Sequence, residues 1–156
     1  MRNRLRNSIF SLLAVSLFTA CNSHTVYHSY QSLPAKGWAK SDTLFFPVCI
    51  KDSVPTALHL FAEVRNIISY DYRSLYLFID QNLQDSTQGK TDTLEINLTD
   101  LKGKWKGIGW GSLFQSVQPI GTFITLHPGN YMIRVSHGMK DENITGINDI
   151  GIRIEK

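Results

Sequence analysis

The chain has 156 residues, with 16 Lys and Arg against 13 Asp and Glu and a formal net charge of +3 at pH 7. Arg2, Arg4 and Arg6 account for the whole excess, so the rest of the chain is formally neutral. Because a nucleic-acid surface needs a clustered basic face, this balance excludes nucleic acid as a partner. The densest basic run, within residues 102–106, is predicted to be a solvated turn.

The first predicted element is an export signal at residues 1–20. The arginines precede an apolar stretch of ten residues, Ile9–Phe18, which suits a secretory signal and is too short to span a bilayer. The small residues Thr19 and Ala20 then lead to Cys21. This layout is typical of a bacterial lipoprotein signal, in which the cysteine sulfur is acylated. An ordinary signal peptide with a cysteine at its boundary is the alternative.

We therefore predict that Cys21 is the lipidation site and that residues 21–25 form a short tether to the membrane. Cys49 is the only other cysteine, so no internal disulfide is expected. It lies in the apolar run Leu44–Ile50. We predict that its thiol is buried as a small hydrophobic group without a catalytic role.

Apolar and polar residues alternate with a period of two along residues 26–156, as in Leu58, Leu60, Ala62 and Val64, which are separated by polar or aromatic residues. Strict alternation predicts strands with one buried face. Strands are predicted at residues 26–32, 43–50, 58–65, 75–80, 93–98, 121–126, 131–136 and 150–155.

About eight short strands separated by Gly and Pro turns predict an all-β protein. The expected fold is an antiparallel, jelly-roll-like β-sandwich, one domain over residues 26–156, with a partly open barrel as the alternative. No segment carries helical amphipathicity over three turns, and Ser112–Val117 is the one stretch compatible with a single helical turn.

The densest polar cluster contains His137, Asp141 and Glu142. An imidazole beside carboxylates could begin a zinc or manganese site, but the spacing matches no recognised ligand pattern, so no metal and no cofactor are expected. Neither a nucleophile–base pair nor a pair of flanking acids can be placed, so no catalytic residue is assigned and the chain is predicted not to be an enzyme. His137 and Asp141 remain candidate contacts for a ligand or partner.

The segment Gly103–Gly111 carries Trp105 and Trp110 among four glycines. Large rings on such a backbone can lie flat on a ligand, which would make the chain a glycan- or peptidoglycan-binding module. We favour the other interpretation, in which the glycines permit a tight crossing and the rings fold onto the sandwich. Trp105 is expected to be largely buried, and Trp110 to be the more exposed ring.

Several segments share features with one known family. They are Asp71–Ile79, Asp92–Leu94 followed by Gly103–Gly109, Pro128–Tyr131, His137–Glu142 and the long C-terminal block Gly146–Lys156. Together with the lipoprotein signal, they resemble the gliding-motility lipoprotein H (GldH) family of the Bacteroidetes.

This resemblance implies a non-enzymatic, lipid-anchored cell-envelope protein associated with gliding motility or envelope assembly. It implies an envelope protein as partner and brings no catalytic residues. Asn22–Thr25 lacks the acidic run that often accompanies surface export in these bacteria. That difference favours an anchor facing the periplasm, in the inner or the outer membrane.

Overall fold

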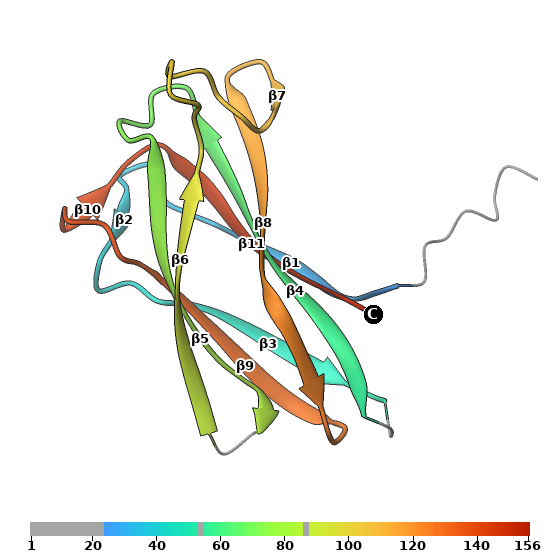
Figure 1. Ribbon diagram of the computed structural model, residues 1–156. Helices are drawn as coiled ribbons and strands as arrows, with labels where there is room; N and C mark the ends of the chain where they lie inside the picture. The colour runs from blue at the N-terminus through green and yellow to red at the C-terminus, as the bar shows by residue number, and fades with distance from the viewer. Residues whose placement is uncertain (1–23, 53–54, 86–87) are drawn as a thin grey trace, which may run out of the picture.

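The alternating segments form long strands in the computed structural model, which describes residues 24–52, 55–85 and 88–156 (Figure 1). The long strands are β1 (Thr25–Ser32), β3 (Leu44–Ile50), β4 (Thr56–Ile67), β5 (Ser74–Asp85), β6 (Gln88–Asn97), β8 (Leu113–Thr125), β9 (Gly129–His137) and β11 (Ile147–Glu155). The short strands are β2 (Trp38–Ala39), β7 (Ile108–Trp110) and β10 (Asn143–Ile144). Over the described ranges, no helix is long and apolar enough to cross a membrane.

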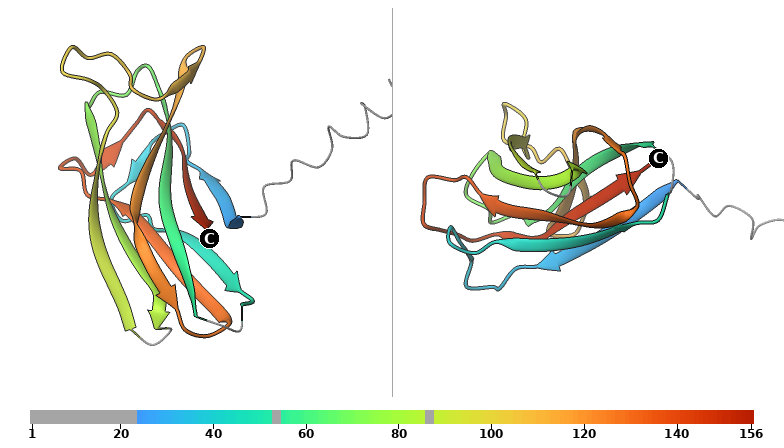
Figure 2. Two further views of the ribbon diagram at one scale, coloured as in Figure 1. Left: turned by 45° about the vertical axis from the view of Figure 1, so that its right-hand side comes forward. Right: turned by 90° about the horizontal axis from the view of Figure 1, so that it is seen from below.

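The strands form two main antiparallel sheets. One has five strands in the order β1-β11-β4-β8-β7, and the other has four in the order β3-β9-β5-β6. The two sheets lie face to face as layers (Figure 2). A separate pair, β10-β2, forms a small arm on one side of the sandwich (Figure 1).

This architecture confirms the predicted all-β antiparallel sandwich, because the two sheets are not closed into a barrel. All eight predicted strands lie within or overlap the eight long ones. The helical turn considered for Ser112–Val117 is wrong, since all of this segment but Ser112 belongs to β8 and pairs with β4, as in Val64↔Ser116 and Glu63↔Val117. A central partner strand satisfies the backbone groups of that segment better than one isolated turn would.

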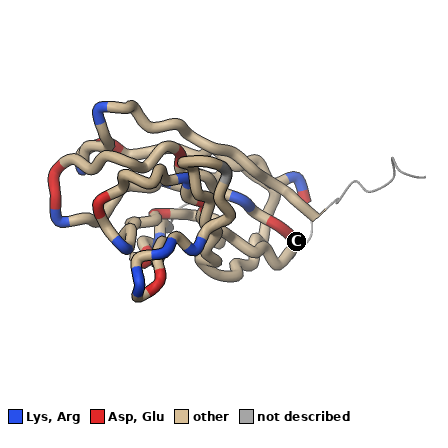
Figure 3. Tube along the Cα trace, turned by 90° about the horizontal axis from the view of Figure 1, so that it is seen from above, with Lys and Arg blue, Asp and Glu red and all other residues tan. Residues whose placement is uncertain are grey.

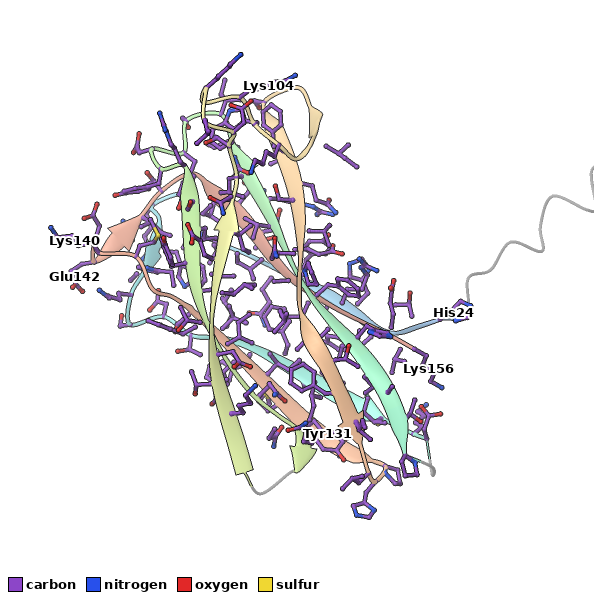
Figure 4. The ribbon with its side chains drawn as sticks, in the orientation of Figure 1. His24, Lys104, Tyr131, Lys140, Glu142 and Lys156 are labelled. Atoms are coloured by element: carbon purple, nitrogen blue, oxygen red, sulfur yellow. The ribbon has the colours of Figure 1, made fainter. Side chains whose placement is uncertain are left out.

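The core lies between the two sheets, where side chains fill the space (Figure 4). Strands of both sheets contribute fully buried aliphatic residues at alternating positions. They are Leu58, Leu60, Ala62 and Val64 of β4, Ile150, Ile152 and Ile154 of β11, and Leu75, Leu77 and Ile79 of β5. The period-two patterns therefore identified the inward faces correctly. The predicted signal at residues 1–20 and its cleavage site lie outside the described residues.

Candidate functional site

His137 is fully buried inside the fold at the end of β9. Its ring meets that of Trp38 edge to face, with centroids 5.2 Å apart. Burial lowers the pKa of the His137 imidazole below its ordinary value, which favours the neutral ring at pH 7. A contact with the Trp38 backbone opposes this shift of the pKa but does not outweigh burial.

Asp141, in contrast, is exposed in the connection between β9 and β10 and accepts a hydrogen bond from the Tyr72 hydroxyl. No hydrogen bond or ion pair found among the described residues joins Asp141 to His137. Among all the residues that the structure describes, no group of three or more His, Cys, Asp or Glu side chains is arranged to hold a metal ion. The structure thus separates these two candidates into an interior ring and a surface carboxylate.

The Trp105 side chain is neither fully buried nor fully exposed. Its ring is partly buried against the core and stacks on Phe114, with centroids 5.7 Å apart and planes inclined by 27°. The backbone of Trp110 ends β7, and its side chain lies outside what the structure describes. Contact of either ring with a ligand therefore stays a prediction.

The basic run beside Trp105 forms a turn organised by one carboxylate. Asp100 Oδ1 accepts hydrogen bonds from the backbone N–H groups of Lys102, at 2.8 Å, and Lys104, at 2.9 Å. The bond from Lys104, assisted by the one from Lys102, holds the pKa of the Asp100 carboxyl below its ordinary value. Figure 3 shows Lys and Arg positions interspersed with Asp and Glu positions along the described chain.

Cys49 is exposed, so the predicted burial of its thiol is wrong. The inward residues of β3 are Phe46, Val48 and Ile50, all buried, which turns Cys49 outward. The apolar run conceals this alternation because Phe45, Pro47 and Cys49 are themselves apolar. An apolar composition shows that a segment is a strand but does not identify its inner face.

Alkylation of the native protein is therefore expected to modify Cys49 at a rate close to that of the unfolded chain. Exposure removes the steric barrier that a core thiol would have. Iodoacetamide labelling at neutral pH, with and without urea and quantified by mass spectrometry, measures the two rates. Protection of about a hundredfold or more in the native state would contradict the exposed position.

The most elaborate polar arrangement lies on the outer face of the five-stranded sheet and was not predicted. Its centre is Glu63 of β4, which is only 2% exposed although it points away from the core. Glu63 Oε1 accepts from Arg153 Nε at 2.6 Å, and Oε2 accepts from the Tyr30 hydroxyl. His28 Nε2 lies 3.1 Å and Gln115 Nε2 lies 3.5 Å from Oε2.

Aromatic rings and guanidinium groups cover this carboxylate. The ring of Tyr30 lies against Gly151, where a Cβ atom would come within 2.6 Å of the ring. Arg65 places its guanidinium carbon 3.8 Å from the centroid of that ring. Arg153 lies 4.5 Å from the centroid of Phe61 in the same way. Glycine at position 151 is therefore required for Tyr30 to reach Glu63, because any larger residue would displace the ring.

The protonation of this cluster follows from its contacts. Burial alone would raise the pKa of the Glu63 carboxyl, but the hydrogen bonds from Tyr30, Arg153 and His28 outweigh burial and lower it. Burial and the bond to Glu63 together raise the pKa of Tyr30 to about 12. Both oxygens of the Glu63 carboxylate thus already accept hydrogen bonds, which makes Glu63 a poor base. The same bonds fix the positions of the donor side chains.

Comparison with known proteins yields a consistent set of relatives. The sequence model of the family described as GldH lipoprotein matches residues 25–154. A protein named gliding motility lipoprotein GldH homolog, from Christiangramia forsetii, is 30% identical, and the alignment covers 100% of this chain and 98% of that protein. The gliding motility lipoprotein GldH of Flavobacterium johnsoniae is 26% identical, with 98% of both chains covered.

Two solved structures show distant similarity. A family 35 carbohydrate binding module from Clostridium thermocellum has 15% sequence identity and a TM-score of 0.43, covering 86% of this chain and 91% of that one. A fructofuranosidase from Schwanniomyces occidentalis has 7% identity and a TM-score of 0.42, covering 86% of this chain and 35% of that one. At these TM-scores the similarities carry no argument about function.

Proposed function

The chain belongs to the GldH lipoprotein family, and we propose that it is a lipid-anchored, non-enzymatic component of the cell envelope that serves gliding motility or envelope assembly. The observation that carries this proposal is the alignment with gliding motility lipoproteins over 98–100% of the chain. A match of that extent includes the N-terminal segment with Cys21 as well as the sandwich.

The two ends of the described sandwich support a membrane-proximal orientation. His24 and Lys156 lie together, since the backbone N–H of Lys156 donates to the His24 carbonyl at 2.8 Å. Cys21 precedes Thr25, the first residue of β1, by four positions, which span at most about 14 Å. An acyl chain on Cys21 would hold this end of the sandwich close to the lipid surface, facing the periplasm.

The opposite side of the molecule is then the one free to meet a protein partner. Lys140 and Glu142, next to the β2–β10 arm, lie on the side away from His24 and Lys156 (Figure 4). The chemistry of the charged cluster also supports a role without catalysis. Glu63 already accepts four hydrogen bonds, so it is poorly placed to take a proton from a substrate.

Replacement of Cys21 by serine is expected to abolish acylation and to move the protein out of the detergent phase in a phase-partition experiment. The described residues contain no helix that could cross a membrane, and all lipid of the predicted anchor is attached at Cys21, so its loss should be visible as nearly complete transfer to the aqueous phase. Labelling with a palmitate analogue should fall to background. Cys49→Ser is the matched control and should change neither readout.

The role in motility is tested by expressing the chain in Flavobacterium johnsoniae cells that lack their own GldH. The wild-type chain and Cys49→Ser are expected to restore surface spreading, whereas Cys21→Ser is not. Equal membrane partitioning of Cys21→Ser and the wild type would overturn the lipid anchor. Full spreading with the unacylated variant would overturn the link between the anchor and the function.

A further inference from the structure

A small apolar patch lies at one end of the five-stranded sheet, where β4 begins and β8 ends (Figure 1). Its large side chains are Ile124, which is 54% exposed, and Leu126, which is 51% exposed. Ala57 pairs directly with Ile124 and is exposed as well, and Pro55 is exposed just before β4. These four residues, Pro55, Ala57, Ile124 and Leu126, are called the rim patch.

The backbone around Leu126 is held in place from both sides. Thr125, the last residue of β8, pairs with Thr56. After the strand, the buried Tyr131 donates from its hydroxyl to the His127 carbonyl at 2.6 Å. A fixed turn therefore keeps half of the Leu126 side chain in water, where its apolar surface contributes nothing to the stability of the fold.

The rim patch lies at the end of the sheet where the chain enters it. One row across four paired strands joins Thr25 to Glu155, Glu155 to His59, and His59 to Thr122. Three strand spacings of about 4.8 Å therefore separate Thr25 from Thr122, and Ile124 lies about 7 Å further along β8. Ile124 is thus about 16 Å from the residue at which the predicted tether joins the sandwich.

The exposed side chain of Ile108, by contrast, lies far from the tether. Ile108 is 89% exposed, but its row across the sheet ends at Ser32. Ser32 is seven residues after Thr25 on β1, a distance of about 23 Å along the strand. Ile124 and Leu126 are therefore much better placed to reach a surface that holds residue 21.

The charges at this end of the sheet are largely compensated. Lys156 Nζ donates to Asp52 Oδ1 at 2.8 Å, and Glu155 pairs with Arg153. Charges that attract one another oppose approach to a layer of low dielectric less than free charges do. Lys51 directly follows β3 at the same end and belongs to none of the ion pairs among the described residues. Its ammonium group can therefore meet the phosphate of a lipid headgroup.

The size of the rim patch favours a lipid surface over a protein partner. A stable protein interface takes about 20–30 residues from each side, with matching shapes. Four side chains fall far short of that number, whereas a fluid bilayer needs no complementary shape. A tether also keeps the lipid at a high effective concentration, so that even a weak contact is occupied.

We propose that the rim patch is a second membrane contact, in which Ile124 and Leu126 enter the boundary between lipid headgroups and acyl chains. This inference rests on the lipid anchor proposed at Cys21. The anchor holds Thr25 within about 14 Å of the bilayer but leaves the sandwich free to rotate about the tether. The second contact removes that freedom and determines which side of the sandwich faces the lipid.

The test uses the full acylated chain carrying Cys49→Ser, so that an introduced cysteine is the only free thiol. Leu126→Cys is labelled with a nitrobenzoxadiazole dye and reconstituted into liposomes of phosphatidylethanolamine and phosphatidylglycerol. A lipid with a nitroxide on its acyl chain should quench this label by about half or more, because an interfacial apolar face enters the bilayer by about 5–10 Å. Ala57→Cys should respond in the same way, and it carries the test if thermal melting shows that labelled Leu126→Cys is unfolded.

Phe45→Cys is the matched control, because Phe45 is also 51% exposed but lies on β3 of the other sheet. Its label should be quenched about fivefold less than the label at position 126. Flotation of the liposomes in a density gradient reports the anchor separately. Flotation with equal quenching at positions 126 and 45 overturns the rim contact and leaves the anchor standing. A chain that does not float with the liposomes overturns the anchor and, with it, this inference.

Discussion

Replacing Trp38 by alanine is expected to lower the free energy of unfolding by about 3–5 kcal/mol, as for other buried large rings. Trp38 is 1% exposed although it belongs to a strand of only two residues. Its ring packs against His137, and its Nε1–H donates to the Asp42 carbonyl at 2.9 Å. The substitution would leave a cavity, remove the hydrogen-bond donor of the Asp42 carbonyl and expose the His137 ring to water.

The expected loss is large because a domain of this size has about 5–15 kcal/mol of stability in total. Urea denaturation followed by circular dichroism measures it. Phe45→Ala is the control, since Phe45 is a large ring that is 51% exposed, and its removal should cost less than about 1 kcal/mol. A loss below about 1 kcal/mol for Trp38→Ala would show that the β2–β10 arm is not packed on the core.

The second large effect is expected for Glu63→Ala, at about 3 kcal/mol, the lower end of the range for breaking a buried ion pair. The substitution leaves the Arg153 guanidinium and the Tyr30 hydroxyl without their main partner in a covered site. Arg153 is 21% exposed at its side chain, so water can partly solvate it, which keeps the loss from being greater.

Glu155→Ala is the matched control for this effect. Glu155 also pairs with Arg153, but its side chain is 31% exposed against 3% for that of Glu63. Exposed ion pairs contribute about 0–1 kcal/mol, so the control should fall in that range. Equal losses for the two variants would show that burial does not distinguish the two carboxylates.

The same carboxylate makes stability depend on pH. Burial alone would raise the pKa of Glu63, but hydrogen bonding holds it below 4.5, its ordinary value, in the folded protein. A lowered pKa in the folded state means that the unfolded state binds the proton more readily. The contribution of Glu63 is therefore fully present above about pH 4.5 and is lost as the pH falls through the folded value. Denaturation of the wild type and Glu63→Gln at a series of pH values measures this contribution. The free energy of unfolding of the wild type should fall more steeply as the pH is lowered than that of Glu63→Gln. Parallel curves of stability against pH would contradict this.

The sequence by itself determined the local features of this protein. Alternation in segments such as 58–65 and 150–155 identified strands and most of their inward faces, because a side-chain period of two is a property of one strand alone. The motifs that identified the family are contiguous as well. Cys49 shows the limit of such patterns, since in a uniformly apolar run the inner face is decided by the partner strand.

Only the tertiary structure decided which polar residues come together. Glu63 and Arg153 are 90 positions apart and meet because β4 and β11 pair in one register. Tyr30 reaches them because Gly151 offers no side chain at the crossing point. Ser116 and Gln118 are likewise turned inward only because they pair with buried residues of β4. Register and layer packing depend on long-range contacts, and a one-residue shift would reverse every one of these faces, so local patterns could not reveal them.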